Sequence, residues 1–312
     1  MEGGLCREEM GMRYKVVYKI LFMNWPLAFT CLYCKWPGRA WPVFAGRSWP
    51  RISAQLGRFG EMKEGSEAAA LVGDSGLRAA ASEWICRMMD AGWEALTPFC
   101  GGYPDRLSER LAANAPPLLW VKGDRLAEAY GWCSVVGSRR LSVPESRFAF
   151  GSGEALAGLG FAVVSGGAQG ADFQGVAGSV ASGGYGAHVL PGGEPRHRKI
   201  ASALVSEAPW EKEFDRVSAL RRNRWIYAMS EISVVCASRF RVGGSWHGAV
   251  TARREKLGRV IVFAPAGGAS EGNAALKCAG FEAVGSVEQL KEVVNAHGMT
   301  GAREGDQARL AV

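Results

Sequence analysis

Short apolar runs and longer amphipathic stretches alternate along the central part of this chain, from about Tyr103 to Pro265. The apolar runs are bounded by glycine, proline and polar residues, and each is only four to six residues long. We expect each to be a buried strand, because short bounded runs of this kind are typical of strands in a parallel sheet. The runs are Cys133–Val136, Phe161–Ser165, Ala187–Leu190, Ala203–Ser206, Ile232–Cys236 and Val260–Ala264.

The stretches between these runs have apolar residues at helical spacing. The predicted helices lie near Val143–Leu159, Gly170–Ser182, Ser218–Ser230, His247–Leu257, Asn273–Ala279 and Val287–Asn295. Strands and helices that alternate in this way predict an α/β fold, Rossmann-like, with a mainly parallel sheet and helices on both faces. Sheets of this class bind ligands at the carboxyl ends of their strands.

The pattern divides the chain into four parts. Residues 1–51 are rich in Trp, Pro and Cys without a steady period, and we interpret them as a poorly defined leader. Residues 52–98 predict a small helical region. The Rossmann-like domain is expected at 99–284, and residues 285–312 predict a C-terminal helix and tail with no winged-helix domain.

Composition and charge indicate which kind of partner and which compartment to expect. The chain has 312 residues, 48% of them hydrophobic, which is enough for a large core. Its net charge of +7 favours a polyanionic partner, nucleic acid above all. Its apolar stretches fall short of the ~20 residues that span a bilayer, so we expect a cytoplasmic protein without a membrane part. Cys31 and Cys34 form a single CxxC, and we expect no metal because a zinc site normally needs four ligands.

Two strand ends predict phosphate-binding loops. Gly137-Ser138-Arg139 follows the first strand: the glycine permits a tight turn, while the next N–H groups, the hydroxyl and the guanidinium can hold a phosphate. Ser165-Gly166-Gly167 follows the second strand and opens a helix. This loop is not a GxGxxG fingerprint, so NAD is disfavoured and we expect no cofactor. We expect Asp172 to have a structural role, either capping that helix or binding a neighbouring loop.

Two further segments, one basic and one rich in small residues, belong to the same predicted edge. Arg222-Asn223-Arg224 lies in a region, 216–259, that is rich in arginine and poor in acidic residues, as nucleic-acid binding requires. Gly244-Ser245 belongs to another small-residue loop before a helix. Trp246 could stack on a base, although an indole packed inside the protein is the simpler interpretation.

The ordered set of motifs resembles the DprA/Smf family over roughly half of the chain. That family reads YPxxL, PPxLLxxxG, a strand ending in GSR, then VVSGxAxGxD, LxxG, SE, RNRxI, a GS-type loop, TA and GRxxxAxPG. The matching segments here are Tyr103–Leu107, Pro116–Gly123, Val135–Arg139, Ser165–Asp172, Leu190–Gly193, Ser206–Glu207, Arg222–Ile226, Gly244–Ser245, Thr251–Ala252 and Gly258–Gly267.

The resemblance implies a single-stranded-DNA-binding protein rather than an enzyme. Members of the family bind DNA along the edge of the Rossmann cleft, form homodimers and load RecA recombinase during natural transformation. Carried over residue by residue, the binding pocket implied for this chain consists of Gly137, Ser138, Arg139, Ser165, Gly166, Gly167, Arg222, Asn223, Arg224, Gly244 and Ser245.

Two alternatives use a related fold. A nucleoside-monophosphate glycosidase would carry PGGxGTxxE, but here Pro191-Gly192-Gly193 is followed by Glu194-Pro195, and Glu207 is the only acid near a strand end. A single carboxylate offers little for general acid–base catalysis. The other alternative is a sensor that binds a small nucleotide without turnover, which would not need the basic segment at 216–259.

Overall fold

The computed structural model describes residues 86–96, 102–111, 115–116, 118–126, 131–192, 200–206 and 216–298. The predicted leader at 1–51, most of the helical region at 52–98 and the tail beyond 298 lie outside the described residues. The chain divides into two compact units: Met1–Tyr103 with Ala112–Leu119, and Pro104–Leu111 with Trp120–Val312.

The first unit has a short helical turn at 86–90 followed by strand β1, Trp93–Leu96. Trp93 and Leu96 are buried in it. The strand falls inside the stretch that the sequence predicted to be helical, because a four-residue strand has too few positions to reveal its period of two. In the same unit, the Tyr103 hydroxyl donates to the carbonyl of Pro116 at 2.7 Å.

The second unit contains a mainly parallel sheet, as predicted. Its strands lie in the order β2-β6-β5-β4-β3-β7-β8-β9. The β2–β6 pairing is antiparallel, and the other pairings in this unit are parallel. The bounds are β2 (Leu119–Gly123), β3 (Trp132–Val136), β4 (Ala162–Ser165), β5 (Gly186–Leu190), β6 (Ala203–Ser206), β7 (Ile232–Val235), β8 (Arg259–Phe263) and β9 (Glu282–Val284).

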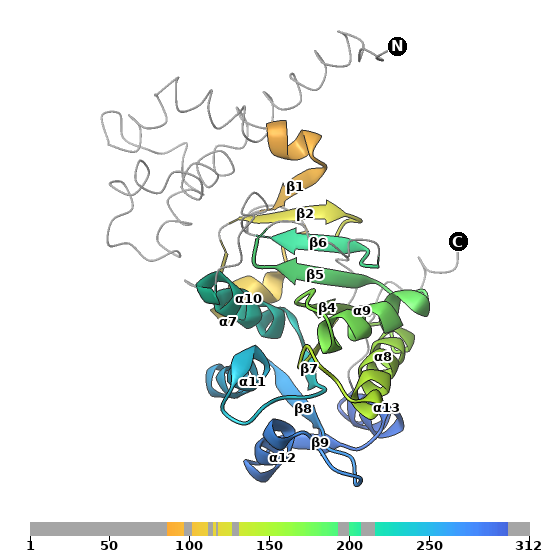
Figure 1. The fold of residues 1–312 in the computed structure, drawn as a ribbon. Helices are drawn as coiled ribbons and strands as arrows, with labels where there is room; N and C mark the ends of the chain where they lie inside the picture. Colours follow the sequence, from red (N-terminus) through yellow and green to blue (C-terminus); the bar gives the residue numbers. More distant parts are fainter. Residues whose placement is uncertain are drawn as a thin grey trace. The chain divides into compact units, whose positions relative to one another are not determined.

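Helices cover both faces of this sheet (Figure 1). They are α7 (Asp105–Leu111), α8 (Val143–Gly158), α9 (Ala171–Ala181), α10 (Arg216–Met229), α11 (Gly243–Glu255), α12 (Glu271–Cys278) and α13 (Val287–Ala296). Helices α8, α9 and α13 lie on one face, and α7, α10 and α11 lie on the other (Figure 1). Among the described helices, none combines the length and apolarity that crossing a bilayer demands.

All six predicted strands and six predicted helices are present in the second unit, and strands β2 and β9 were not predicted. Cys133 and Cys236 are fully buried and belong to the hydrophobic core of this unit. Helix α8 begins with a capping box, in which the Ser142 hydroxyl accepts from the N–H of Glu145 and the Glu145 carboxylate accepts from the N–H of Ser142. Helix α11 begins at Gly243, four residues earlier than predicted.

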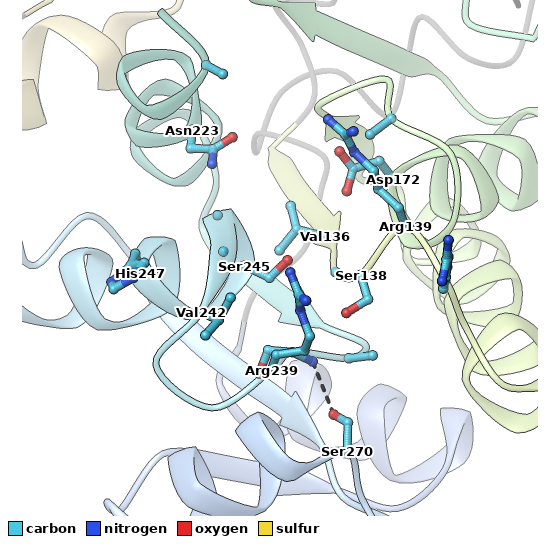
Figure 2. A pocket seen from close by; sticks show the side chains of 18 of the residues that line it. Val136, Ser138, Arg139, Asp172, Asn223, Arg239, Val242, Ser245, His247 and Ser270 are labelled. Atoms are coloured by element: carbon cyan, nitrogen blue, oxygen red, sulfur yellow. Dashed lines mark hydrogen bonds between the residues drawn. The ribbon is translucent and has the colours of Figure 1, made fainter. Parts of the chain in front are cut away.

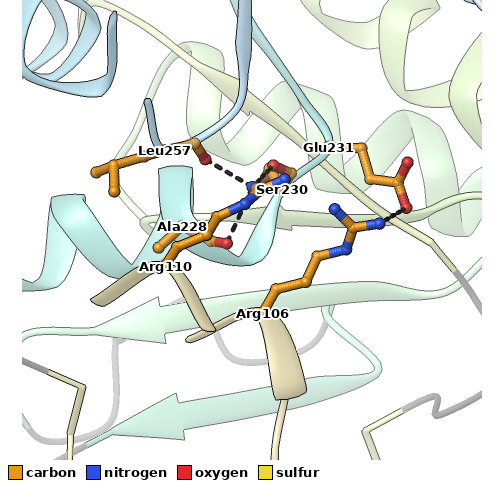
Figure 3. A network of polar contacts seen from close by, with 6 residues as sticks. All are labelled: Arg106, Arg110, Ala228, Ser230, Glu231 and Leu257. Carbon is orange, nitrogen blue, oxygen red and sulfur yellow. Dashed lines mark hydrogen bonds and ion pairs between the residues drawn. The ribbon is translucent and has the colours of Figure 1, made fainter. Parts of the chain in front are cut away.

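Arg110 on α7 joins the ends of two other helices (Figure 3). Its Nη1 donates to the carbonyl oxygens of Ala228 at 3.1 Å, Ser230 at 2.5 Å and Leu257 at 2.6 Å. Ala228 is in the last turn of α10, and Leu257 follows the end of α11. A cation at this position satisfies carbonyls that have no partner within their helices and opposes the negative end of the helix dipole. Arg110 therefore fixes the carboxyl ends of α10 and α11 against α7.

We predict that Arg110→Met lowers the free energy of unfolding by about 2–3 kcal/mol, since it removes charge-assisted bonds to three carbonyls. The matched control is Arg106→Met on the same helix. Arg106 makes one partly exposed ion pair with Glu231 at 2.8 Å, whose loss should cost at most about 1 kcal/mol. Urea unfolding of both variants checks this, and equal losses would show that Arg110 contributes no more than a surface ion pair.

Candidate functional site

A pocket of about 1150 Å³ opens at the carboxyl ends of β3 and β7 (Figure 2). The chain runs from β3 to β4 in one direction across the sheet and from β7 to β8 in the other, so this is the point where the strand order reverses. Ligands of open α/β sheets bind at such points. Of the predicted site residues, those that line the pocket are Gly137, Ser138, Arg139, Arg222, Asn223, Gly244 and Ser245.

The loop after β3 forms one wall of the pocket. Gly137 is needed for close packing, because a Cβ there would lie 2.7 Å from the Cβ of Ala171. The Ser138 N–H donates to the carbonyl of Ala237 at 2.9 Å, which corrects the prediction that it is free to bind a phosphate. The Ser138 hydroxyl and the exposed Arg139 side chain belong to the pocket lining, and Arg139 lies beside Asp172 in Figure 2.

The loop after β4 supports the pocket and contributes Ala168 to its lining, whereas the three residues predicted for the site in this segment do not line it. The Ser165 hydroxyl donates to the carbonyl of Val135 at 2.5 Å inside the sheet. The N–H of Gly166 donates to the Asp172 carboxylate at 3.1 Å, which confirms that Asp172 binds a neighbouring loop. Gly167 has a φ of +68°, a conformation that favours glycine. Ser165, Gly166 and Gly167 therefore determine the shape of the loop, through internal hydrogen bonds and a backbone conformation that favours glycine.

Arg222 on α10 supplies a buried cation to the pocket. Its side chain is only 8% exposed, and its Nε has no hydrogen-bond partner among the described residues. Burial lowers the pKa of the guanidinium and Asp172 opposes that shift, while Arg139 lowers it further. A buried donor without a partner is unfavourable, so an anion that entered the pocket would gain from it.

Asp172 belongs to the pocket lining, although the sequence suggested only a structural role. Burial raises the pKa of its carboxyl, and the charge of Arg222 is the largest opposing effect. Tyr227 also lines the pocket, although the sequence did not predict it as a site residue. Its buried hydroxyl has no hydrogen-bond partner among the described residues. His188 on β5 does not line the pocket, but it is buried near Gly167 and its Nδ1 has no hydrogen-bond partner among the described residues. Burial, followed by the charge of Arg222, lowers the pKa of His188 to about 4.

Helices α10 and α11 approach closely at the opposite wall. A Cβ on Gly244 would lie 2.7 Å from the side-chain nitrogen of Asn223, so glycine permits this approach. Gly244 and Ser245 lie in the first turn of α11, and the residue before that helix, Val242, has no side chain that can cap it. Uncapped N–H groups at the positive end of a 13-residue helix are suited to an anion. The pocket thus combines these donors with Arg222.

Arg224 is not brought to the pocket. Its Nε and Nη2 both donate to the same carboxylate oxygen of Glu255, at 2.9 and 2.7 Å. This ion pair joins α10 to the end of α11. The geometry gives Arg224 a structural partner and leaves Arg222 as the arginine of this segment that lines the pocket.

The start of α12 fixes the loop after β7. Asn273 is fully buried and donates to the carbonyls of Val235 at 2.8 Å and Phe263 at 2.9 Å, while its side-chain oxygen accepts from the Ser238 hydroxyl at 2.7 Å. The Ser238 N–H donates to the Ser270 hydroxyl at 3.1 Å (Figure 2). These bonds hold the loop that carries Arg239 at the edge of the pocket.

The family of the chain follows from a match over residues 94–295 to the model of the DNA recombination-mediator protein A family. The chain belongs to this family. The membership confirms the resemblance to DprA/Smf proteins that the ordered motifs indicated. No curated protein matches the chain.

Two solved structures of DNA processing protein A share the fold of this family member. The protein from Streptococcus pneumoniae is 22% identical, with a TM-score of 0.57 over 71% of this chain and 81% of that chain. The protein from Helicobacter pylori is 18% identical, with a TM-score of 0.55 over 66% of this chain and 96% of that chain. At these identities the likeness shows a common fold.

We predict that Gly166→Ala destabilises this family member by about 1–3 kcal/mol, as overpacked sites do. The added Cβ would lie 1.7 Å from Nη1 of Arg222 and 2.5 Å from the Asp172 carboxylate, so the buried charges would have to move. Gly267→Ala is the matched control, because no heavy atom lies within 4 Å of that Cβ. Thermal unfolding of the two variants checks the prediction. Equal stability would mean that Arg222 can leave its position at no cost.

Proposed function

We propose that this protein binds single-stranded DNA and holds its phosphates in the pocket between β3 and β7. The observation that carries the proposal is the buried Arg222, whose Nε has no partner among the described residues and which lines the same pocket as the uncapped start of α11. Arg139 adds a second guanidinium to the same lining. Fixed donors and positive charge in one cavity suit a phosphate, whatever base it carries.

Membership of the DNA recombination-mediator protein A family supports a role in DNA processing. The related protein from Helicobacter pylori is described as binding single-stranded DNA, which supports the same ligand for this chain. We further propose that the protein acts as a homodimer in the cytoplasm, on DNA taken up during natural transformation, and that it loads RecA for recombination. These finer proposals rest on the family resemblance.

Two of the three acidic residues that line the pocket already have structural partners, which favours binding without catalysis. Its lining includes the carboxylates of Asp172, Glu145 and Glu271. Asp172 is engaged with Gly166 and Arg222, and Glu145 caps α8. The residues Glu194 and Glu207, which bear on the glycosidase alternative, lie outside the described residues.

A nucleotide sensor is the second candidate, because the volume of the pocket would accept a mononucleotide. Titration with nucleoside monophosphates distinguishes the two candidates. A sensor would bind the mononucleotide as tightly as an oligonucleotide, whereas a DNA-binding protein would gain affinity with strand length.

We predict that Arg139→Gln weakens binding of single-stranded DNA of any sequence and reduces the magnitude of the negative slope of log K against log salt by about 0.7, the value for one phosphate contact. Fluorescence anisotropy of a labelled oligonucleotide at several salt concentrations measures both quantities. Arg224→Gln is the matched control. Like Arg139→Gln, it removes one positive charge, but from a side chain on α10 that is already bound to Glu255. We therefore expect this variant to have the same salt slope as the wild type.

Either of two results would contradict the assignment. An unchanged slope in Arg139→Gln would remove Arg139 from the phosphate contacts. A less steep salt slope in Arg224→Gln alone would indicate that the DNA binds on the outer side of α10 and not in the pocket. Failure of the wild-type protein to bind at low salt would overturn the proposed function itself.

A further inference from the structure

A four-residue turn at the edge of the pocket exposes an aromatic ring. Residues Arg239 and Val242 form an isolated antiparallel bridge, and the N–H of Val242 donates to the carbonyl of Arg239 at 3.3 Å. Both residues line the pocket (Figure 2). Phe240 and Arg241 lie between them, at the tip of the turn. Phe240 is 38% exposed, although a phenyl ring is usually buried.

The exposed ring is held in one place by its neighbours. The ring of Trp246 lies edge-on to Phe240, with centroids 5.2 Å apart and planes at 79°. The guanidinium carbon of Arg241 lies 5.0 Å from the centroid of the Phe240 ring. Aromatic and cation–π contacts of this kind order side chains that would otherwise move freely in solvent. Trp246 is thus the partner of the exposed ring.

The backbone of the turn adds a further constraint. Arg241 has a φ of +55°, in the left-handed region that glycine occupies most easily. A non-glycine residue in that region costs of order 1 kcal/mol or more, and such residues cluster at functional sites. Here the residue with this conformation lies at the tip of the turn, next to Phe240.

The surroundings indicate what covers the ring. Val242 is 49% exposed and Leu220 of α10 is 54% exposed, and both line the pocket next to its arginines. Apolar surface beside positive charge matches a nucleic acid strand, whose bases have flat apolar faces and whose backbone is polyanionic. Arg239 and Arg241 supply charge for that backbone on the turn itself.

We propose that the turn Arg239–Val242 is a base-stacking site, in which a nucleobase of the bound strand stacks on the tip formed by Phe240 and Arg241. The inference rests on the proposed function, because the strand is the one whose phosphate occupies the pocket. Stacking does not distinguish among bases, and it requires a base that is free of a complementary strand. The site therefore adds affinity for single strands without sequence preference.

The test compares a thymidine oligonucleotide with one of equal length whose central nucleotides are abasic. We expect Phe240→Ala to weaken binding of the thymidine oligonucleotide by about 5-fold to 150-fold, the range for the loss of one stacked base. Binding of the abasic oligonucleotide should not change, because it retains the phosphates and lacks the base. Phe240→Trp should keep full affinity. Val143→Ala, an exposed apolar residue on α8, should have no effect on either ligand.

The outcomes separate this inference from the proposed function. Wild-type protein that binds neither oligonucleotide overturns the proposed function. Wild-type protein that binds both, with Phe240→Ala matching it on the thymidine oligonucleotide, overturns the stacking site and leaves the phosphate pocket intact. Equal weakening of both ligands in Phe240→Ala also overturns stacking, because the loss would then act through the pocket. Two controls show that the fold is preserved: thermal unfolding of Phe240→Ala that matches the wild type, and full binding by Phe240→Trp.

Discussion

The pocket is organised around a buried positive charge, the guanidinium of Arg222. Removing such a group from water costs several kcal/mol unless it is paired. Asp172 compensates part of that cost, and its carboxylate is held in turn by the N–H of Gly166. The compensation is incomplete, since the Nε of Arg222 has no partner among the described residues. The fold thus keeps a charge in a position where an anionic ligand completes its environment.

This constraint explains several glycines near the pocket. A side chain at Gly166 would overlap Arg222, and one at Gly244 would press on Asn223. A side chain at Gly137 would separate the loop after β3 from α9. The small residues that the sequence presents as phosphate-binding loops are therefore needed in part for packing. They let two helices and two loops converge on one charged group, and the free donors of α11 come with that convergence.

The fold was predictable because a parallel sheet covered on both faces has strands that are apolar at nearly every position. Strand β9, with only three residues, gives no such signal, and the apolar run that forms β2 was interpreted as part of a motif. The site was predictable only in part. Loops at the carboxyl ends of neighbouring strands must meet, which brought Gly137–Arg139 and Gly244–Ser245 together. The sequence could not show which backbone N–H groups are already used, as that of Ser138 is by Ala237.

The arginines of α10 show the same limit most clearly. Arg222 and Arg224 are two residues apart, so they project about 200° apart around the helix, and only one can face the pocket. The neighbouring sequence does not indicate which of the two faces the pocket, because both belong to the same basic segment. The choice depends on Glu255, which lies 31 residues further on and binds Arg224.

The pocket and the neighbouring turn would contribute to binding in different ways. Contacts between arginine and phosphate are electrostatic, so they weaken as salt rises and hardly distinguish one strand from two. An aromatic ring needs an unpaired base and is insensitive to salt. Only a single strand can satisfy both at once, because a duplex keeps its bases stacked inside. Selectivity for single-stranded DNA would thus follow from the exposure of Phe240 next to the charge of Arg222 and Arg139, without any contact that reads a base edge.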